Sequence, residues 1–456
     1  MNEIVQYIFN FLTDFHFSER NGNLFAYTSN HNDFGKYKII IKKSDFFDNN
    51  IFLTQKSLPA LPLTTWEGVP LLFGEPTVDR QGDTMALNAD IIASSFFLLT
   101  RYEELINASR DEHGRFAAQN SLPFRAGFLH RPVVDEYGRA LRNLLRNNGI
   151  KMPAEKPFGI EKIYLTHDVD CLAHYRNFRS LAGAILRRRN IKMAFETFFG
   201  KIENDEWYTF PFLFEKDSSL NFDNIEKTVF ILKEYAPKNP LKTTFRRKRE
   251  EYFAETGTDK DKSNFQFRTN DFQKFIALCQ INDVKTGLHA SYAAGENPAL
   301  IAAEKLALER ATGHAITCNR NHYLRSKEPR DFRKLIEAGI SQDFTMTYAQ
   351  CAGFRLGTAH NVRWIDAENL EVTPLTLHPL AVMDNSLSAE KYMNLSENDA
   401  FNYAKQLIDA TAKFNGELSL LWHNTSVSEN YHRNLYSKII SYLKKLSIGS
   451  SQVSED

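Results

Sequence analysis

Hydrophobic and polar positions follow one pattern in the first third of the chain and another after it. In the first part, residues 36–41 predict a strand and residues 88–106 predict a long amphipathic helix. A linker at 151–158 follows, and its prolines disfavour a continued helix. Beyond it, short apolar runs alternate with helical segments, as is typical of a parallel sheet or a barrel. The pattern therefore predicts an α+β domain over residues 1–152 and an α/β domain over residues 158–447.

The apolar runs of the second domain have the length of strands. They occupy residues 163–166, 284–288, 315–318, 344–348, 372–377 and 418–422. Helices are predicted after Asn297-Pro298, over 330–338 and from Ser396 to just before Gly416, and a polar tail over 448–456. Charged and histidine residues follow several of the runs. The carboxyl ends of parallel strands are where α/β folds build their sites, so the chemistry is expected there.

Composition narrows the classes of protein that fit this pattern. The chain has 456 residues, enough for two or more domains of roughly 100–200 residues each. Hydrophobic residues make up 43% and aromatic residues 13%, which is enough for sizeable cores and argues against disorder. Basic and acidic residues balance at 56 each. The chain therefore lacks the positive charge of a dedicated nucleic-acid binder or of a polybasic membrane anchor.

The cysteines and the amino terminus bear on the compartment. Cys171, Cys279, Cys318 and Cys351 are far apart and form no CxxC pair, so neither a disulfide framework nor a structural zinc knuckle is expected. The amino-terminal residues lack a basic segment followed by an apolar stretch. No apolar run reaches the length of about 18 residues that a membrane span requires. We therefore expect a cytoplasmic protein without a transmembrane segment.

Asp168 and Asp170 form the first candidate for chemistry. In an extended strand, residues two apart point to the same side, so both carboxylates can face one site. Two buried carboxylates repel each other unless a cation or a proton lies between them, and a divalent metal would relieve this repulsion. An exposed Asp-rich turn or a helix cap is the alternative. His289, also at the end of an apolar run, favours the metal.

Four motifs together resemble those of the polysaccharide deacetylases, the NodB-homology enzymes of carbohydrate esterase family 4. In chain order they are Thr166-His167-Asp168-Val169-Asp170, Gly287-Leu288-His289-Ala290-Ser291, Arg320-Asn321-His322-Tyr323 and Leu420-Leu421-Trp422-His423-Asn424. The resemblance covers roughly residues 160–430 as an ordered set of motifs. It implies an irregular (β/α) barrel that holds one divalent metal, usually Zn²⁺, and hydrolyses an acetamido group on a sugar.

The resemblance also implies roles for single residues. Asp168 matches the general base, and Arg320 looks like the arginine that orients this base. Asp170 and His289 match metal ligands, with Asp170 displaced by one residue because the adjacent aspartates of the family are here Asp-Val-Asp. These four residues are therefore expected around one metal.

Two further residues of the motifs would complete the reaction. Tyr323 falls where the family's tyrosine supplies a backbone N–H to the oxyanion, and His423 matches the histidine that acts as general acid. Both are expected at the same strand ends as the metal ligands.

The sequence departs from the family at the second metal histidine. That ligand lies four residues after the first one in the family, and the position is Ala293 here. His322 stands where the third motif has a proline, so we infer that it supplies the third ligand, because one Asp and two His are a normal catalytic zinc set. The alternative is that His322 only donates hydrogen bonds around the site.

Three more residues are candidate substrate contacts. Ser291 belongs to the second motif, Arg355 lies in the glycine-flanked loop 353–358, and Trp422 offers a ring of the kind that stacks on sugars. A surface arginine is the alternative for Arg355, and a place in the core is the alternative for Trp422.

Segments outside the motifs add less. Residues 101–104, 110–116 and 127–129 look like parts of the leader domain found before divergent bacterial deacetylase-like barrels. The basic runs 187–189 and 246–249 would suit an anionic glycan carrier or membrane, although solvated helix faces explain them as well.

The predicted function is metal-dependent removal of an N-acetyl group from an amino sugar of a surface-glycan precursor or polysaccharide. One alternative is hydrolysis of a cyclic or non-sugar amide on the same barrel. The other is a glycan-binding or scaffold module that has lost the metal.

Overall fold

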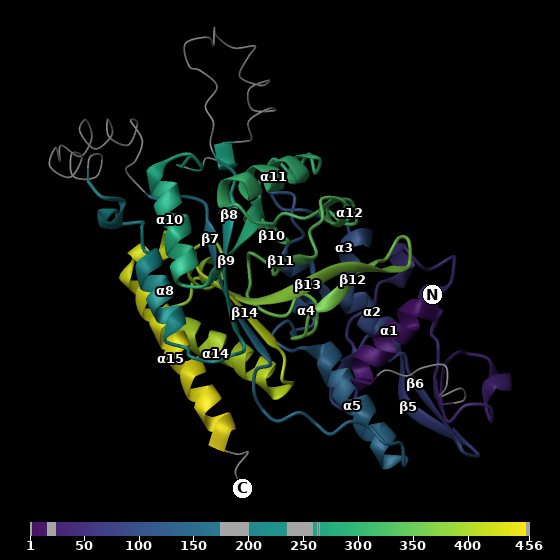
Figure 1. Ribbon diagram of the computed structural model, residues 1–456. Helices are drawn as coiled ribbons and strands as arrows, with labels where there is room; N and C mark the ends of the chain where they lie inside the picture. The colour runs from purple at the N-terminus through teal and green to yellow at the C-terminus, as the bar shows by residue number, and fades with distance from the viewer. Residues whose placement is uncertain are drawn as a thin grey trace.

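A computed structural model describes residues 2–15, 24–173, 200–234, 259–261, 263 and 265–452 (Figure 1). The basic runs 187–189 and 246–249 lie outside these residues. Within them, no helix is both long and apolar enough to cross a membrane. The cytoplasmic location and the absence of a nucleic-acid partner stay predictions.

The second domain is built around a closed barrel of seven parallel strands among the described residues. In order around the barrel they are β7 (Lys162–Val169), β8 (Ile225–Leu232), β9 (Val284–Ala290), β10 (Cys318–Asn321), β11 (Gln342–Met346), β13 (Glu371–Met383) and β14 (Glu417–Leu421). The barrel closes because β11 pairs with β13 and β14 pairs with β7. A further strand, β12 (Val362–Asp366), pairs antiparallel with β13 outside the closed ring. The predicted α/β barrel is confirmed.

Helices cover the outside of this barrel (Figure 1). They are α8 (Phe210–Ser218), α10 (Asn270–Ile281), α11 (Leu300–Thr312), α12 (Arg330–Glu337), α14 (Glu397–Lys413) and α15 (Asn430–Gln452), with the short α13 (Asp384–Ser388) directly after β13. The predicted start of α14 is confirmed, because the Ser396 side chain accepts a hydrogen bond from the backbone N–H of Asp399. Because α15 extends to Gln452, part of the predicted polar tail is helical.

The amino-terminal unit is a mixed sheet with helices on it. The sheet has the order β1 (Phe25–Tyr27), β2 (Ile39–Ile41), β6 (Thr84–Ala89) and β5 (Gly74–Gln81), with β5 antiparallel to its neighbour. A separate hairpin consists of β3 (Thr64–Trp66) and β4 (Val69–Leu71). The helices are α1 (Asn2–Thr13), α2 (Ile91–Leu99), α3 (Glu103–Ile106), α4 (Leu122–Arg125) and α5 (Val133–Asn147).

The long helix predicted over 88–106 is wrong in its extent. The Asp90 side chain accepts a hydrogen bond from the backbone N–H of Ala93 and caps α2, so the residues before it belong to strand β6. The helix ends at Leu99, and Arg101 adopts a positive φ of 50°, which a continuous helix does not allow. Capping at one end and a left-handed residue at the other divide the apolar segment into a strand and two helices.

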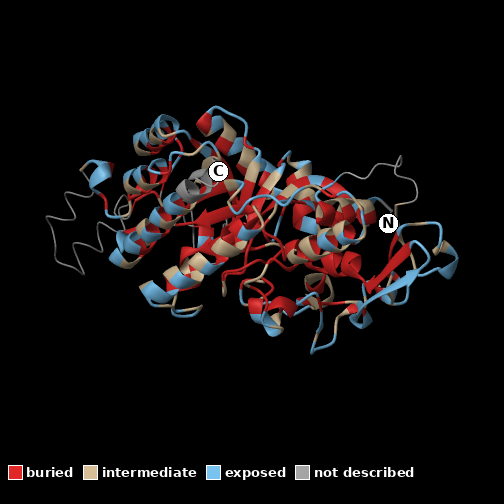
Figure 2. Cartoon of the chain, turned by 90° about the horizontal axis from the view of Figure 1, so that it is seen from below, coloured by how far each residue is buried: buried red, intermediate tan, exposed pale blue. Residues whose placement is uncertain are grey.

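The two units share one hydrophobic core. Buried apolar residues of α1, α2 and α5 form a continuous cluster with those of the barrel strands, and Figure 2 shows buried segments running through the interior of both parts. Polar contacts cross the same boundary, because the Arg355 guanidinium donates two hydrogen bonds to the Glu104 carboxylate at 2.9 and 2.7 Å. The amino-terminal unit is therefore packed against the barrel as part of the same folded body.

Candidate metal centre and catalytic cleft

The predicted motif residues meet at the carboxyl ends of the barrel strands. Asp168 is the penultimate residue of β7, and Asp170 follows directly after this strand. His289 is the penultimate residue of β9, and it is in register with Arg320 on the neighbouring β10. His423 lies two residues after β14, and this strand pairs with β7 on the side of β7 away from β8. Parallel pairing around the closed barrel therefore brings segments more than a hundred residues apart to one edge.

Three side chains at this edge form a set that could hold a metal ion. Asp170, His289 and His322 offer ligand atoms that all lie within 4.8 Å of one another. The Asp170 Oδ1 atom is 3.2 Å from His289 Nε2 and 3.5 Å from His322 Nε2. This oxygen is buried and has no hydrogen-bond partner among the described residues. A buried carboxylate oxygen facing two imidazole nitrogens fits a cation, since an unpaired buried charge is otherwise costly.

Hydrogen bonds orient both histidines for this role. His289 Nδ1 lies 2.8 Å from the carbonyl oxygen of Arg320, which can only accept, so Nδ1 carries a proton and Nε2 is the nitrogen directed to Asp170. His322 Nδ1 lies 3.2 Å from the Asp261 carboxylate, which leaves His322 Nε2 directed to Asp170 in the same way. Histidine ligands of metals are commonly held by such a bond at the other ring nitrogen.

Asp261 is a site residue that the sequence analysis missed. Its carboxylate accepts hydrogen bonds from the backbone N–H groups of Tyr292 and Ala293, at 2.5 and 2.9 Å. Burial by itself raises the pKa of Asp261, but His322 and these N–H groups outweigh burial and lower it. Ala293 stands where the motif resemblance expects a second metal histidine. Its backbone N–H instead helps to hold the Asp261 carboxylate, which orients His322.

Asp168 lies beside this set and is held by Arg320. The buried guanidinium of Arg320 donates to Asp168 Oδ1 at 2.8 Å, to the Thr166 hydroxyl and to the carbonyl of Phe344. The other oxygen of Asp168, Oδ2, is 3.6 Å from His289 Nε2 and 3.9 Å from His423 Nε2. One carboxylate oxygen is therefore occupied by Arg320, and the other faces the cleft between the metal set and His423.

His423 is paired with a second residue that the motifs do not contain, Asp384. The Asp384 carboxylate at the start of α13 accepts from the backbone N–H of His423 at 2.8 Å and lies 2.9 Å from its Nδ1. Burial by itself lowers the pKa of His423, but the charge of Asp384, with smaller effects of Asp168 and Asp170, raises it to about 10. The imidazole is therefore protonated at neutral pH, with Nε2 directed to the cleft.

These groups line a cleft of about 540 Å³. Asp168, Asp170, His289, His322 and His423 all form part of its wall. Tyr323 lines it as well, in a 3₁₀ turn at His322–Leu324 where its φ is 61°. A left-handed conformation is uncommon for an aromatic residue and occurs most often at functional sites.

Three predicted substrate contacts do not line this cleft. Arg355 is 5% exposed and is tied to Glu104 and to the carbonyl of Thr347. Trp422 is fully buried, and its ring packs 5.1 Å from the ring of Tyr436. Ser291 is buried and donates its hydroxyl to Glu304. Barrel closure and the packing of helices turn these side chains away from the cleft, and their role as substrate contacts stays a prediction.

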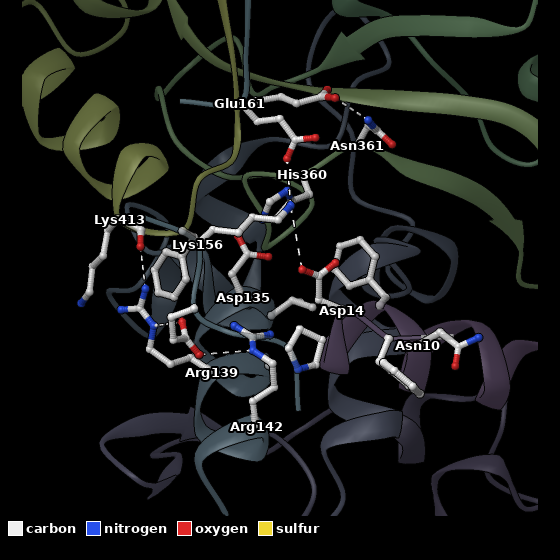
Figure 3. Close-up of a pocket in the computed structure, with 18 of the residues that line it drawn as sticks. Asn10, Asp14, Asp135, Arg139, Arg142, Lys156, Glu161, His360, Asn361 and Lys413 are labelled. Carbon is white, nitrogen blue, oxygen red and sulfur yellow. Dashed lines mark hydrogen bonds and ion pairs between the residues drawn. The ribbon is translucent and has the colours of Figure 1, made fainter. Parts of the chain in front are cut away.

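A second cavity lies between the amino-terminal unit and the barrel (Figure 3). It measures about 410 Å³, and none of the predicted site residues lines it. Its charged groups pair with one another: Arg139 and Arg142 both contact Glu155, and Lys156 lies 3.1 Å from Glu161. We therefore place the chemistry in the cleft at the strand ends.

Comparisons with known proteins give limited information. Residues 1–149 match a family described as a family of unknown function, DUF7033. Comparison with curated protein sequences finds no significant match. Among solved structures, a crystal structure of a Mycobacterium smegmatis protein, provisionally assigned as a polysaccharide deacetylase, is similar at 14% sequence identity and a TM-score of 0.37. The similarity covers 64% of this chain and 87% of that one.

Proposed function

We propose that the chain is a metal-dependent hydrolase that removes an N-acetyl group from an amino sugar of a surface-glycan precursor or polysaccharide. The observation that carries the proposal is the cluster of Asp170, His289 and His322 beside Asp168 and His423 in one cleft. The three side chains would hold one divalent metal, with Zn²⁺ favoured by the two imidazoles and one carboxylate. Such a metal, when bound, lowers the pKa of a water and polarises an amide carbonyl.

The protein's own groups account for the proton transfers. Asp168 takes the proton of the attacking water through Oδ2, while Arg320 fixes this carboxylate through Oδ1. Protonated His423 delivers its Nε2 proton to the nitrogen of the leaving amine, which is otherwise a poor leaving group. The backbone N–H of Tyr323 remains the proposed donor to the oxyanion.

The first test is the metal content of the full chain purified without chelator. We expect close to one zinc-like ion per chain. His322→Ala, His289→Ala and Asp170→Asn should each reduce the content to a small fraction, because each removes one of only three ligands. His31→Ala is the matched control, since His31 is exposed in the amino-terminal unit. Full metal retention by His322→Ala would show that this histidine only donates hydrogen bonds.

The second test is acetate release. The metal-loaded chain should release acetate from at least one member of a panel of N-acetylated amino sugars, and His423→Ala should slow this release by about 10²-fold or more. Activity on cyclic or non-sugar amides alone would leave a hydrolase with another substrate. A chain that binds no metal and releases no acetate after zinc addition would be a scaffold, and the proposal would be wrong.

A further inference from the structure

Three cationic side chains border the cleft, and each comes from a different part of the chain. Arg115 belongs to the amino-terminal unit, Lys260 to the 3₁₀ helix Asp259–Asp261, and Lys391 to the segment after α13. Among the described residues that line the cleft, only Asp168 and Asp170 carry a negative charge. Asp168 is neutralised by Arg320, and Asp170 belongs to the metal set. Arg115 is likewise paired with Asp111, so the positive charge that the cleft wall adds comes mainly from Lys260 and Lys391, although the whole chain is neutral.

Arg115 is fixed at the cleft by contacts that cross between the two units. Its Nη1 donates to the carbonyl oxygen of Tyr323 at 3.0 Å, and its Nη2 is 3.4 Å from the hydroxyl of Tyr392. Its Nε donates to Asp111, which holds the side chain from behind. Arg115 is largely buried, so its guanidinium is placed beside the left-handed turn at Tyr323 with little freedom to move.

The two lysines flank the same region over aromatic rings. Lys260 Nζ lies 4.7 Å from the ring centre of Tyr292 and donates to His113 Nδ1 at 2.8 Å. Lys391 Nζ lies 5.0 Å from the ring centre of Tyr392. Rings in these positions hold an ammonium group near the wall without cancelling its charge.

The state of His113 agrees with a positive potential at this wall. Burial lowers the pKa of His113, and the charges of Arg115 and Lys260 lower it further, against smaller opposite effects of Asp111 and Glu112. Its Nδ1 can therefore accept the hydrogen bond from Lys260 in the neutral form. An anion entering between Arg115 and the lysines would meet several donors, while the Asp111 carboxylate is already bound to Arg115 Nε.

We propose that the cleft binds an acetamido sugar that carries an anionic group, phosphate or carboxylate, through Arg115, Lys260 and Lys391. This assignment rests on the proposed deacetylase function for the reaction, but the binding itself does not require catalysis. It gives the amino-terminal unit a direct part in the site, because Arg115 reaches the cleft from that unit. An uncharged acetamido sugar would gain little from these cations.

Two measurements on the metal-loaded full chain test the assignment. The first is calorimetric binding of glucosamine 1-phosphate and of glucosamine. Both compounds are already deacetylated and are not turned over, so this readout is independent of catalysis. The second is kcat/KM for acetate release from N-acetylglucosamine 1-phosphate, a carboxylated N-acetyl sugar and neutral N-acetylglucosamine. The sugars with a phosphate or carboxylate should bind and react at least tenfold better than their counterparts without one. The relative values for phosphate and carboxylate identify the source of the charge.

Charge-removing variants separate substrate contact from a structural role. Lys391→Gln should weaken binding of glucosamine 1-phosphate about tenfold and leave glucosamine within twofold, and Arg115→Gln should weaken glucosamine 1-phosphate clearly more than glucosamine. Lys56→Gln, an equal charge change at an exposed residue outside the cleft, is the control. Equal losses for charged and neutral sugars would mean that Arg115 only holds the Tyr323 turn, and the assignment would be wrong.

The remaining outcomes are also decisive. Binding of glucosamine 1-phosphate that depends on Arg115 without any acetate release would support the anion site and reject the deacetylase. Acetate release with equal preference for neutral sugars would support the deacetylase and reject the anion site. Absence of measurable binding of every charged sugar at millimolar concentration would overturn the anion site as well.

Discussion

His423 and Asp384 show how a buried pair sets the charge of a group that faces the cleft. Asp384 is fully buried, and although burial raises its pKa, the adjacent His423 lowers it to about 2. The ionised carboxylate in turn keeps the imidazole protonated. His423, the proposed proton donor opposite Asp168, therefore depends for its charge on Asp384, which does not line the cleft.

This pairing predicts a change in the pH profile of Asp384→Asn. Since His423 acts in its protonated form, activity is lost as the pH rises through the pKa of this histidine. Removing the Asp384 charge should lower that pKa toward its ordinary value of about 6.5. The alkaline limb of kcat/KM for acetate release should move down by at least one pH unit. The variant His423→Ala should lack this limb, and an unchanged limb in Asp384→Asn would reject His423 as the donor.

The contact of Asp261 with His322 leads to a prediction about metal affinity. Its carboxylate orients His322, so Asp261→Asn should weaken zinc binding by about 10- to 100-fold, as losses of such partners commonly do. Competition with a chromophoric chelator measures this affinity without any substrate. Asp223→Asn, the same change at an exposed residue outside the cleft, is the control. Equal zinc affinity in both variants would remove Asp261 from the site.

At the scale of elements, close packing inside the barrel fixes how the strands approach one another. Gly287 lies in β9 two residues before His289, and a Cβ added there would meet the Phe230 ring at 2.7 Å and Cys318 Sγ at 2.8 Å. These neighbours belong to β8 and β10, the strands on either side. The absence of a side chain at Gly287 is thus needed for the spacing of three strands that carry or adjoin site residues.

Gly287→Ala should therefore destabilise the barrel by about 1–3 kcal/mol, the usual effect of forcing an extra methyl group into a packed core. Denaturant unfolding of the full chain measures this difference. Gly159→Ala is the control, because a Cβ there would meet only Asn415 at an ordinary 3.8 Å. A loss below about 0.5 kcal/mol in Gly287→Ala would show that the strands adjust without strain.

At the scale of the whole molecule, the two units act as one folded body. The apolar core runs through both, and the buried Arg355 of the barrel is paired with Glu104 of the amino-terminal unit. Arg101, also in that unit, forms an ion pair with Glu328 close to the barrel helix α12. Charged pairs buried across a boundary hold the units in one relative position, which the contact of Arg115 with the cleft requires.

The pair of Arg355 and Glu104 predicts strong coupling between two mutations. Arg355→Met alone leaves the partly buried Glu104 carboxylate with only Arg101 at 4.0 Å and should lower the free energy of unfolding by about 1–3 kcal/mol. Combining it with Glu104→Met should restore much of this loss, because both charges are then removed. Urea unfolding of the four proteins completes the cycle. Additive losses in the double variant would show that the pair does not couple the units.

Much of the barrel could be predicted from the sequence, because its signals are local. Alternating apolar runs and helices indicate parallel strands, and residues at the ends of such runs must gather at one edge. The order of Asp168, His289, Arg320 and His423 at successive runs was therefore informative. Strand β8 was missed because Glu226 and Lys227 interrupt its apolar pattern.

The partners of the site residues depend on the tertiary structure. Asp261 and Asp384 belong to no motif, and each contacts a site histidine from a segment whose position follows only from chain closure. Arg115 lines the cleft, and the likeness of residues 110–116 to a leader domain did not indicate this. No periodicity marks contacts between residues more than a hundred positions apart, such as Arg115 and Tyr323. Such contacts arise from packing, which local sequence does not encode.

The sequence by itself determined the alternation of elements and the side chains that could bind a metal or move protons. Only the tertiary structure decided which of them share a cleft. It brings His322 to Asp170 and His289, and it buries Arg355 and Trp422 away from them. The physical reason is that side-chain direction at a strand end depends on barrel closure and on the helices packed outside, and both are set by the whole chain.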